Sequence, residues 1–128
     1  MAGYVTDIEE KTANNRNFRT VLFTTSRSQL VVMNLRPKED IGSEVHDDVD
    51  QFIRVEAGEA KAVLNGKEYP LKDGSAVVIP AGVEHNIINT SAKEDLRLYT
   101  IYTPPEHKDG AVHKTKAEAD AAEAAEHH

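Results

Sequence analysis

Apolar and polar residues alternate over short stretches along most of this chain, a pattern that is typical of β-strands. The stretches are rich in β-branched residues and are separated by Gly, Pro, Asn, Asp or Ser, which favour turns. The expected strands are residues 19–25, 29–35, 51–56, 60–64, 68–71, 76–79, a strand beginning at 85, and 96–103. About eight short strands with little helix predict an all-β sandwich or barrel.

Helical signals occur only near the two ends of the sequence. Asp7 is suited to cap a short helix over residues 8–11, which should break at the asparagines that follow. Thr115 and Glu118 form a capping box ahead of an alanine-rich and glutamate-rich helix over residues 116–126. Because its apolar face is alanine alone, this second helix should be marginal unless it docks on the rest of the protein.

The length of 128 residues predicts a single domain with one hydrophobic core. We divide it into an N-terminal arm (1–18) packed outside a barrel, the barrel itself (19–103) and a C-terminal extension (104–128). The last two residues, His127 and His128, are interpreted as the remnant of a purification tag and take no part in the functional reasoning.

Composition and charge exclude several classes of function. Hydrophobic residues make up 39% and charged residues 29%, as in ordinary globular proteins, and no apolar run approaches the ~20 residues that span a bilayer. With no leader segment visible, a cytoplasmic location is expected. The net charge of −7 and the lack of a basic cluster argue against nucleic acid as a partner. Without cysteine, a metal would need imidazole, carboxylate or amide ligands.

The stretch from Gly74 to Asn89 carries the clearest candidate chemistry. A short buried strand over residues 76–79 is closed by a Pro-Ala-Gly turn, and a second strand then begins at His85. Strand alternation places His85 and Ile87 on one face. A single imidazole is thereby expected to point into the barrel.

The same stretch resembles a known family. Gly74, Pro80, Gly82, His85 and Asn89 fit the second cupin motif, G-x5-P-x-G-x2-H-x3-N, at every spacing. This resemblance implies a jelly-roll barrel, the double-stranded β-helix of the cupins, in which His85 is one of the metal ligands. The remaining ligands would come from an earlier motif.

The first cupin motif is present with substitutions. Gln51 and Gly58 match its Glu-x6-Gly end, with glutamine in place of glutamate. His46 lies five residues before Gln51, which is the spacing of the family's second histidine, and Glu44 then stands in place of the first. In an extended strand, Glu44 and His46 share one face, as two ligands of a single ion require.

An alternative alignment remains open at this point. It makes His46 the first histidine and lets Asp48 or Asp50 replace the second. By the strict count, the resemblance implies a divalent metal, Mn, Fe, Ni or Zn, with these ligands: Glu44, His46, Gln51 and His85.

Two tyrosines and two further histidines are also candidates for a functional role. Tyr99 and Tyr102 fall on opposite faces of the last strand and are interpreted as core residues. His107 and His113 lie six residues apart, a poor spacing for a metal site within one element. We expect both histidines to be solvated unless their segment folds over the barrel opening.

Among cupins, the chain most resembles the small single-domain cupin-2 or mannose-6-phosphate-isomerase-like proteins. The resemblance implies a metal-dependent enzyme acting on a small polar organic or sugar-like substrate, by dioxygenation or isomerisation. The alternative is a non-catalytic binding module, a sensor or storage cupin, because the fold alone does not decide between them. A homodimer is expected, since open sheet edges need covering.

Overall fold

The computed structural model of the chain describes residues 2–126, and within them the chain forms nine strands and two helices. In chain order these are α1 (Ile8–Asn14), β1 (Arg19–Thr24), β2 (Gln29–Leu35), β3 (Asp50–Ala57), β4 (Ala60–Leu64), β5 (Lys67–Leu71), β6 (Ala76–Ile79), β7 (His85–Asn89), β8 (Leu96–Thr103), β9 (Val112–His113) and α2 (Lys116–Glu126). The eight strands expected from the pattern are all present, with ends that differ by a residue or two.

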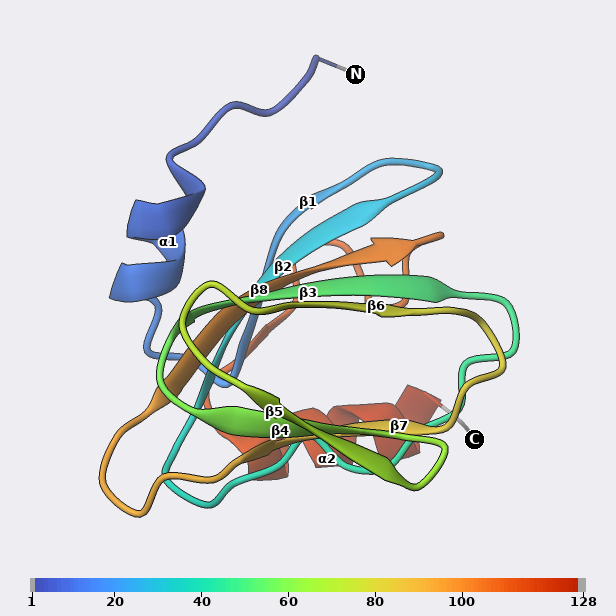
Figure 1. Ribbon diagram of the computed structural model, residues 1–128. Helices are drawn as coiled ribbons and strands as arrows, with labels where there is room; N and C mark the ends of the chain where they lie inside the picture. The colour runs from blue at the N-terminus through green and yellow to red at the C-terminus, as the bar shows by residue number, and fades with distance from the viewer. Residues whose placement is uncertain (1, 127–128) are drawn as a thin grey trace.

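The strands form two antiparallel sheets that face each other (Figure 1). One sheet has the order β6-β3-β8-β2-β1-β9 and the other has the order β5-β4-β7. The expected all-β, double-stranded β-helix fold is confirmed, although the two sheets do not close into one continuous barrel.

The smaller layer is extended by a loop segment and a helix. Backbone bridges join Asp40 to Ile88 and Glu44 to His85, so residues 40–44 run beside β7. Helix α2 lies in the same layer, below the larger sheet in Figure 1, and an ion pair between Lys116 and Asp40 ties it to this segment. The C-terminal helix therefore docks, as its weak apolar face requires.

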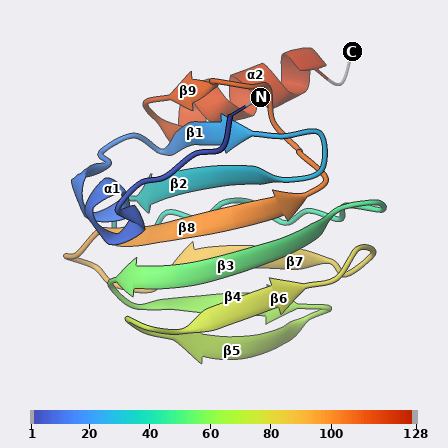
Figure 2. The same cartoon turned by 90° about the horizontal axis from the view of Figure 1, so that it is seen from above.

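Two local signals read from the sequence have the expected geometry. The hairpin between β4 and β5 turns at Asn65 and Gly66, whose φ angles of 49° and 82° suit the primed turns of β-hairpins. At the start of α2, the Glu118 amide donates to the Thr115 hydroxyl, and the Glu118 carboxylate accepts from the Thr115 amide. Helix α1 packs outside the larger sheet, as predicted for the arm (Figure 2).

The interior lies between the two sheets and receives alternate residues of each strand. On β8, the buried face carries Leu96, Leu98, Thr100 and Tyr102. Tyr102 therefore faces inward and Tyr99 lies on the outer face, beside Phe52. The inner face is mainly apolar, and the polar side chains buried among its residues include Gln51, His85 and Thr100.

The segment after β8 departs from expectation. Residues 104–113 fold back along the β1 edge of the larger sheet, and β9 pairs with β1 through Arg19 and Thr20 (Figure 2). The expectation that His107 and His113 are solvated is wrong, because Gln29 fixes the His107 backbone through its side chain and both histidines are partly buried. A two-residue strand is too short to leave a periodic signal.

Neither helix within residues 2–126 has the length and apolar character that crossing a bilayer requires.

Candidate functional site

The turn between β6 and β7 places the first-motif residues beside His85. The Gly82 amide, at a φ of 87° that favours glycine, donates to the His46 carbonyl at 2.8 Å. The backbones of Glu44 and His85 exchange two hydrogen bonds of 2.9 Å. Two motifs separated by some forty residues of sequence are thus joined by backbone pairing.

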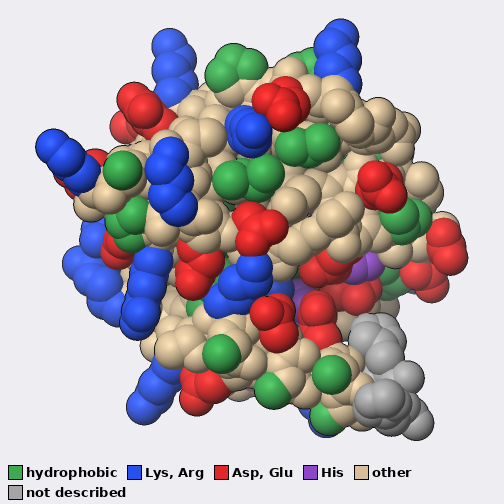
Figure 3. All heavy atoms as spheres, turned by 90° about the horizontal axis from the view of Figure 1, so that it is seen from below, with side chains coloured by type: hydrophobic (Ala, Val, Ile, Leu, Met, Phe, Trp, Pro, Cys, Tyr) green, Lys and Arg blue, Asp and Glu red, His purple; other side chains and the backbone are tan. Residues whose placement is uncertain are grey.

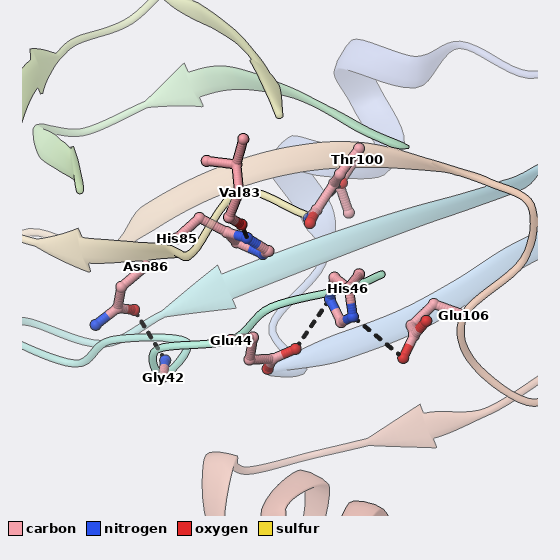
Figure 4. A network of polar contacts seen from close by, with 9 residues as sticks. Gly42, Glu44, His46, Val83, His85, Asn86, Thr100 and Glu106 are labelled. Carbon is pink, nitrogen blue, oxygen red and sulfur yellow. Dashed lines mark hydrogen bonds and ion pairs between the residues drawn. The ribbon is translucent and has the colours of Figure 1, made fainter. Parts of the chain in front are cut away.

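His85 has one imidazole nitrogen fixed and one available. It is 6% exposed, and its Nδ1 lies 2.9 Å from the Val83 carbonyl oxygen (Figure 4). A carbonyl can only accept, so Nδ1 carries the hydrogen and Nε2 keeps its lone pair in the neutral ring. The ring centroid is 5.2 Å from that of His46. An imidazole held in this way is suited to bind a metal through Nε2.

His46 lies between two carboxylates. Its Nε2 is 3.0 Å from Glu44, and its Nδ1 is 3.6 Å from Glu106 (Figure 4). The hydrogen bond that His46 donates to Glu44 raises the pKa of His46, burial opposes that rise, and the charge of Glu106 adds to it. The expectation that Glu44 and His46 share a face is confirmed, since their side chains are in contact.

Gln51 faces the same end of the interior from β3. It is 4% exposed and donates from Nε2 to the Thr100 hydroxyl at 3.0 Å. Its Oε1 is buried and has no partner among the described residues. An unpaired buried acceptor is costly, so this oxygen is expected to bind a partner outside the protein, such as a water molecule or a ligand.

The aspartates of the alternative alignment do not face this region. Asp48 is exposed. Asp50 is exposed as well, and its carboxylate accepts a hydrogen bond from the Ala81 amide. The geometry therefore favours the strict count, with Glu44 rather than either aspartate next to His46.

A pocket of about 230 Å³ opens beside His46. It is lined by Glu44, Val45, His46, Glu106 and Glu123, the last from α2. Histidine and acidic side chains meet on the face seen in Figure 3. Burial, followed by the charge of Glu44, raises the pKa of Glu123. Glu106 and Glu123 were not identified from the sequence, because they lie in the extension and fit no motif.

The nitrogen and oxygen atoms at this site are of the kinds that bind a divalent cation. They are not, however, already arranged around one point. Within residues 2–126, no three His, Asp or Glu side chains are placed to hold a metal ion together. His85 Nε2 and Gln51 Oε1 are available, whereas His46 and Glu44 are paired with each other. An ion would replace the proton that joins this pair, and the nearby carboxylates would favour its charge.

The pairing of His46 predicts a pH effect in the metal-free protein. Its folded pKa lies above 6.5, so the stability from pairing is present below pH 6.5 and is lost as pH rises through the folded value. Glu44→Gln removes the strongest partner and is expected to lower the pKa of His46. Proton NMR titration of chelator-treated protein measures this, with Asp48→Asn as the matched control. An unchanged His46 pKa in Glu44→Gln would show that the pair is not formed.

Comparison with known proteins gives a consistent result. The family model described as "Cupin domain" matches residues 31–102. An uncharacterised protein of Bacillus subtilis is 44% identical over 126 residues, covering 94% of this chain and 67% of that protein. Another, from Acanthamoeba polyphaga mimivirus, is 47% identical over 113 residues, covering 85% of this chain and 70% of that protein.

Solved structures agree with the sequence relatives. A crystal structure of a Bacillus halodurans protein is 40% identical, with a TM-score of 0.91 over 94% of this chain and 95% of that chain. A predicted oxalate decarboxylase from Thermotoga maritima is 25% identical, with a TM-score of 0.58 over 62% of this chain and 69% of that chain. With the family model covering more than half of the sequence and both motifs meeting at one site, the chain belongs to the cupin family.

Proposed function

We propose that this cupin binds a divalent metal ion through four side chains and uses it to act on a small polar organic molecule. The four ligands proposed are Glu44, His46, Gln51 and His85. One observation supports the proposal: two potential ligand atoms without a hydrogen-bond partner among residues 2–126, His85 Nε2 and Gln51 Oε1, come from opposite sheets to one end of the interior. Both are suitable metal ligands in a protein without cysteine.

The residues around the site have distinct parts in this proposal. The Val83 carbonyl holds the His85 ring, and the Thr100 hydroxyl accepts a hydrogen bond from Gln51 Nε2. Glu106 and Glu123 line the pocket and add negative charge that favours a cation. The ion, as Mn, Fe, Ni or Zn, would supply Lewis-acid or oxygen-activating chemistry.

An enzymatic function, of the dioxygenase or isomerase type, is the first proposal. The Thermotoga maritima neighbour, described as a predicted oxalate decarboxylase, supports an enzymatic role for this architecture. The second candidate is a non-catalytic binding module, favoured by the neutral Gln51 and by the His46–Glu44 pair. A molecule that stays bound after metal removal would favour the module, whereas metal-dependent turnover would favour the enzyme.

The direct test is elemental analysis of the protein purified without a nickel column. A stoichiometric transition metal that chelator removes and that returns on dialysis would support the proposal. Absence of any bound metal, before and after incubation with each of the four candidate ions, would contradict it.

Gln51→Glu is expected to tighten metal binding by about tenfold, because a carboxylate replaces a neutral amide beside a cation. The variant retains the length of the side chain, so the Thr100 contact can be kept through the hydroxyl donor. Competition against a fluorescent chelator measures the affinity. The matched control is Asn14→Asp, the same change of amide to acid at an exposed residue of α1, outside the larger sheet. Equal or weaker binding in Gln51→Glu would remove Gln51 from the ligand set.

A further inference from the structure

Gln29 is a buried amide that holds the chain just after β8. It is 1% exposed and begins β2. Its Oε1 accepts hydrogen bonds from the backbone amides of Glu106 and His107, at 3.2 and 2.9 Å. Its Nε2 donates to the His107 carbonyl at 2.7 Å. Three hydrogen bonds from one buried side chain to two consecutive residues fix the backbone of residues 106 and 107, and therefore the direction in which their side chains leave it.

This anchor lies in the same row of the larger sheet as the proposed ligand Gln51. Gln29 pairs in register with Tyr102, and Tyr102 pairs in register with Gln51. The His107 ring meets the Tyr102 ring edge-on, with centroids 5.0 Å apart. The segment after β8 is thus held at two points, by Gln29 and by Tyr102, both level with the candidate site.

Glu106, held in this way, directs its carboxylate at the His46 ring. Its Oε1 lies 3.6 Å from His46 Nδ1, an ion-pair distance that is slightly long for a direct hydrogen bond (Figure 4). The side chains of His46 and Glu106 are 12% and 23% exposed, so water screens the contact only in part. Within residues 2–126, two carboxylates contact this ring, that of Glu44 at Nε2 and that of Glu106 at Nδ1.

The two carboxylates have different roles if the His46 ring binds an ion. A neutral imidazole has one N–H and one lone pair, and the partner of the N–H determines which nitrogen is left to bind a metal. Glu44 is itself a proposed ligand and faces Nε2 at 3.0 Å, so an ion bound by both would replace the proton that joins them. The ring hydrogen then remains on Nδ1, which faces Glu106.

We propose that Glu106 is a positioning residue, which keeps the ring hydrogen of His46 on Nδ1 so that Nε2 is the atom that binds the ion. The inference rests on the proposed function for the presence of the ion, and it gives a role to a residue outside both sequence motifs. An acceptor of this kind orients the ring and makes its other nitrogen more basic. His85 has a matching arrangement, because the Val83 carbonyl accepts from its Nδ1.

The test combines zinc affinity, measured by competition against a fluorescent chelator, with nitrogen-15 NMR of the histidine rings in the zinc-loaded protein. In the parent protein, His46 is expected to carry its hydrogen on Nδ1 and to bind zinc through Nε2. Glu106→Ala is expected to weaken zinc binding by at least about tenfold and to lose the Nδ1 hydrogen signal by exchange with water. Glu106→Gln keeps an acceptor oxygen and should recover part of both. Gln29 bonds to the backbone of residue 106, so the segment stays anchored in these variants.

Glu123→Ala is the control for charge, because it removes a second carboxylate from the same pocket. It should weaken zinc binding less than Glu106→Ala and leave the Nδ1 hydrogen of His46 in place. Equal zinc affinity in Glu106→Ala and Glu123→Ala would reduce Glu106 to a source of charge and overturn the inference. Zinc bound through Nδ1 of His46 in the parent protein would overturn it as well.

A measurement without metal separates this inference from the proposed function. In chelator-treated Glu44→Ala, at a pH where the His46 ring is neutral, Glu106 is expected to hold the ring hydrogen on Nδ1. Adding Glu106→Ala to this variant should remove that preference. A preference that depends on Glu106, in a protein that takes up no zinc, would uphold the positioning role and contradict the metal-dependent function. A ring hydrogen whose place does not depend on Glu106 would overturn the inference, whether or not zinc binds.

Discussion

Replacing His85 by alanine is expected to abolish stoichiometric metal binding while leaving the protein folded. Loss of a group that merely orients a metal ligand already costs about tenfold to a hundredfold in affinity, so loss of the ligand itself should cost at least about a hundredfold. The β7 backbone pairings of residue 85 with Leu64 and Glu44 do not need the imidazole. Metal content and far-UV circular dichroism of the variant, measured side by side, check both parts.

Matched variants assign the remaining ligands. His46→Ala should behave like His85→Ala, and Glu44→Gln should weaken binding less, because a neutral oxygen remains. Asp48→Asn should leave metal content unchanged, since this aspartate is exposed. Full metal occupancy in His85→Ala would contradict the whole site. Loss of metal in Asp48→Asn with no change in Glu44→Gln would replace Glu44 by Asp48 in the ligand set.

The parts of the site that lie in local patterns could be predicted from the sequence. The turn after β6 is specified by Pro80 and Gly82, and strand alternation from there directs His85 inward. The i and i+2 spacing of Glu44 and His46 likewise places both side chains on one face if the segment before β3 is extended, and there Glu44 forms a bridge with His85. Short-range geometry of this kind depends on neighbouring residues, and therefore it is readable in one sequence.

The parts of the site that depend on long-range packing could not be predicted. Arg19 begins a strand that reads as amphipathic, yet it is only 2% exposed in the structure, where β1 pairs with β9 at this residue. Glu106 and Glu123 reach the pocket because the chain turns back after β8, and the polar sequence of that extension is equally typical of a solvated tail. Only the tertiary structure shows that Asp48 and Asp50 are exposed, which favours Glu44 over the two aspartates.

His107 is expected to make the protein lose stability in acid. Burial, together with the charges of Arg19, His113 and His46, lowers the pKa of His107 to about 3. The unfolded chain takes up a proton at this residue below pH 6.5, whereas the folded chain does not until about pH 3. The stability associated with neutral His107 is therefore complete above pH 6.5 and is lost as pH falls, by about 1 kcal/mol per pH unit.

His107→Gln removes this proton linkage and should flatten the decline in the free energy of unfolding between pH 7 and about pH 4.5. Gln29 holds the backbone of residue 107, so the segment stays anchored in the variant. Urea unfolding at several pH values measures the effect. The control is His46→Gln, for which the effect has the opposite sign. Because the pKa of His46 is raised in the folded protein, this residue stabilises the protein in acid, and the variant is expected to be destabilised most at low pH. Parallel pH profiles for His107→Gln and the parent protein would mean that His107 takes up its proton at the same pH in the folded protein as in the unfolded chain, and would contradict a lowered pKa.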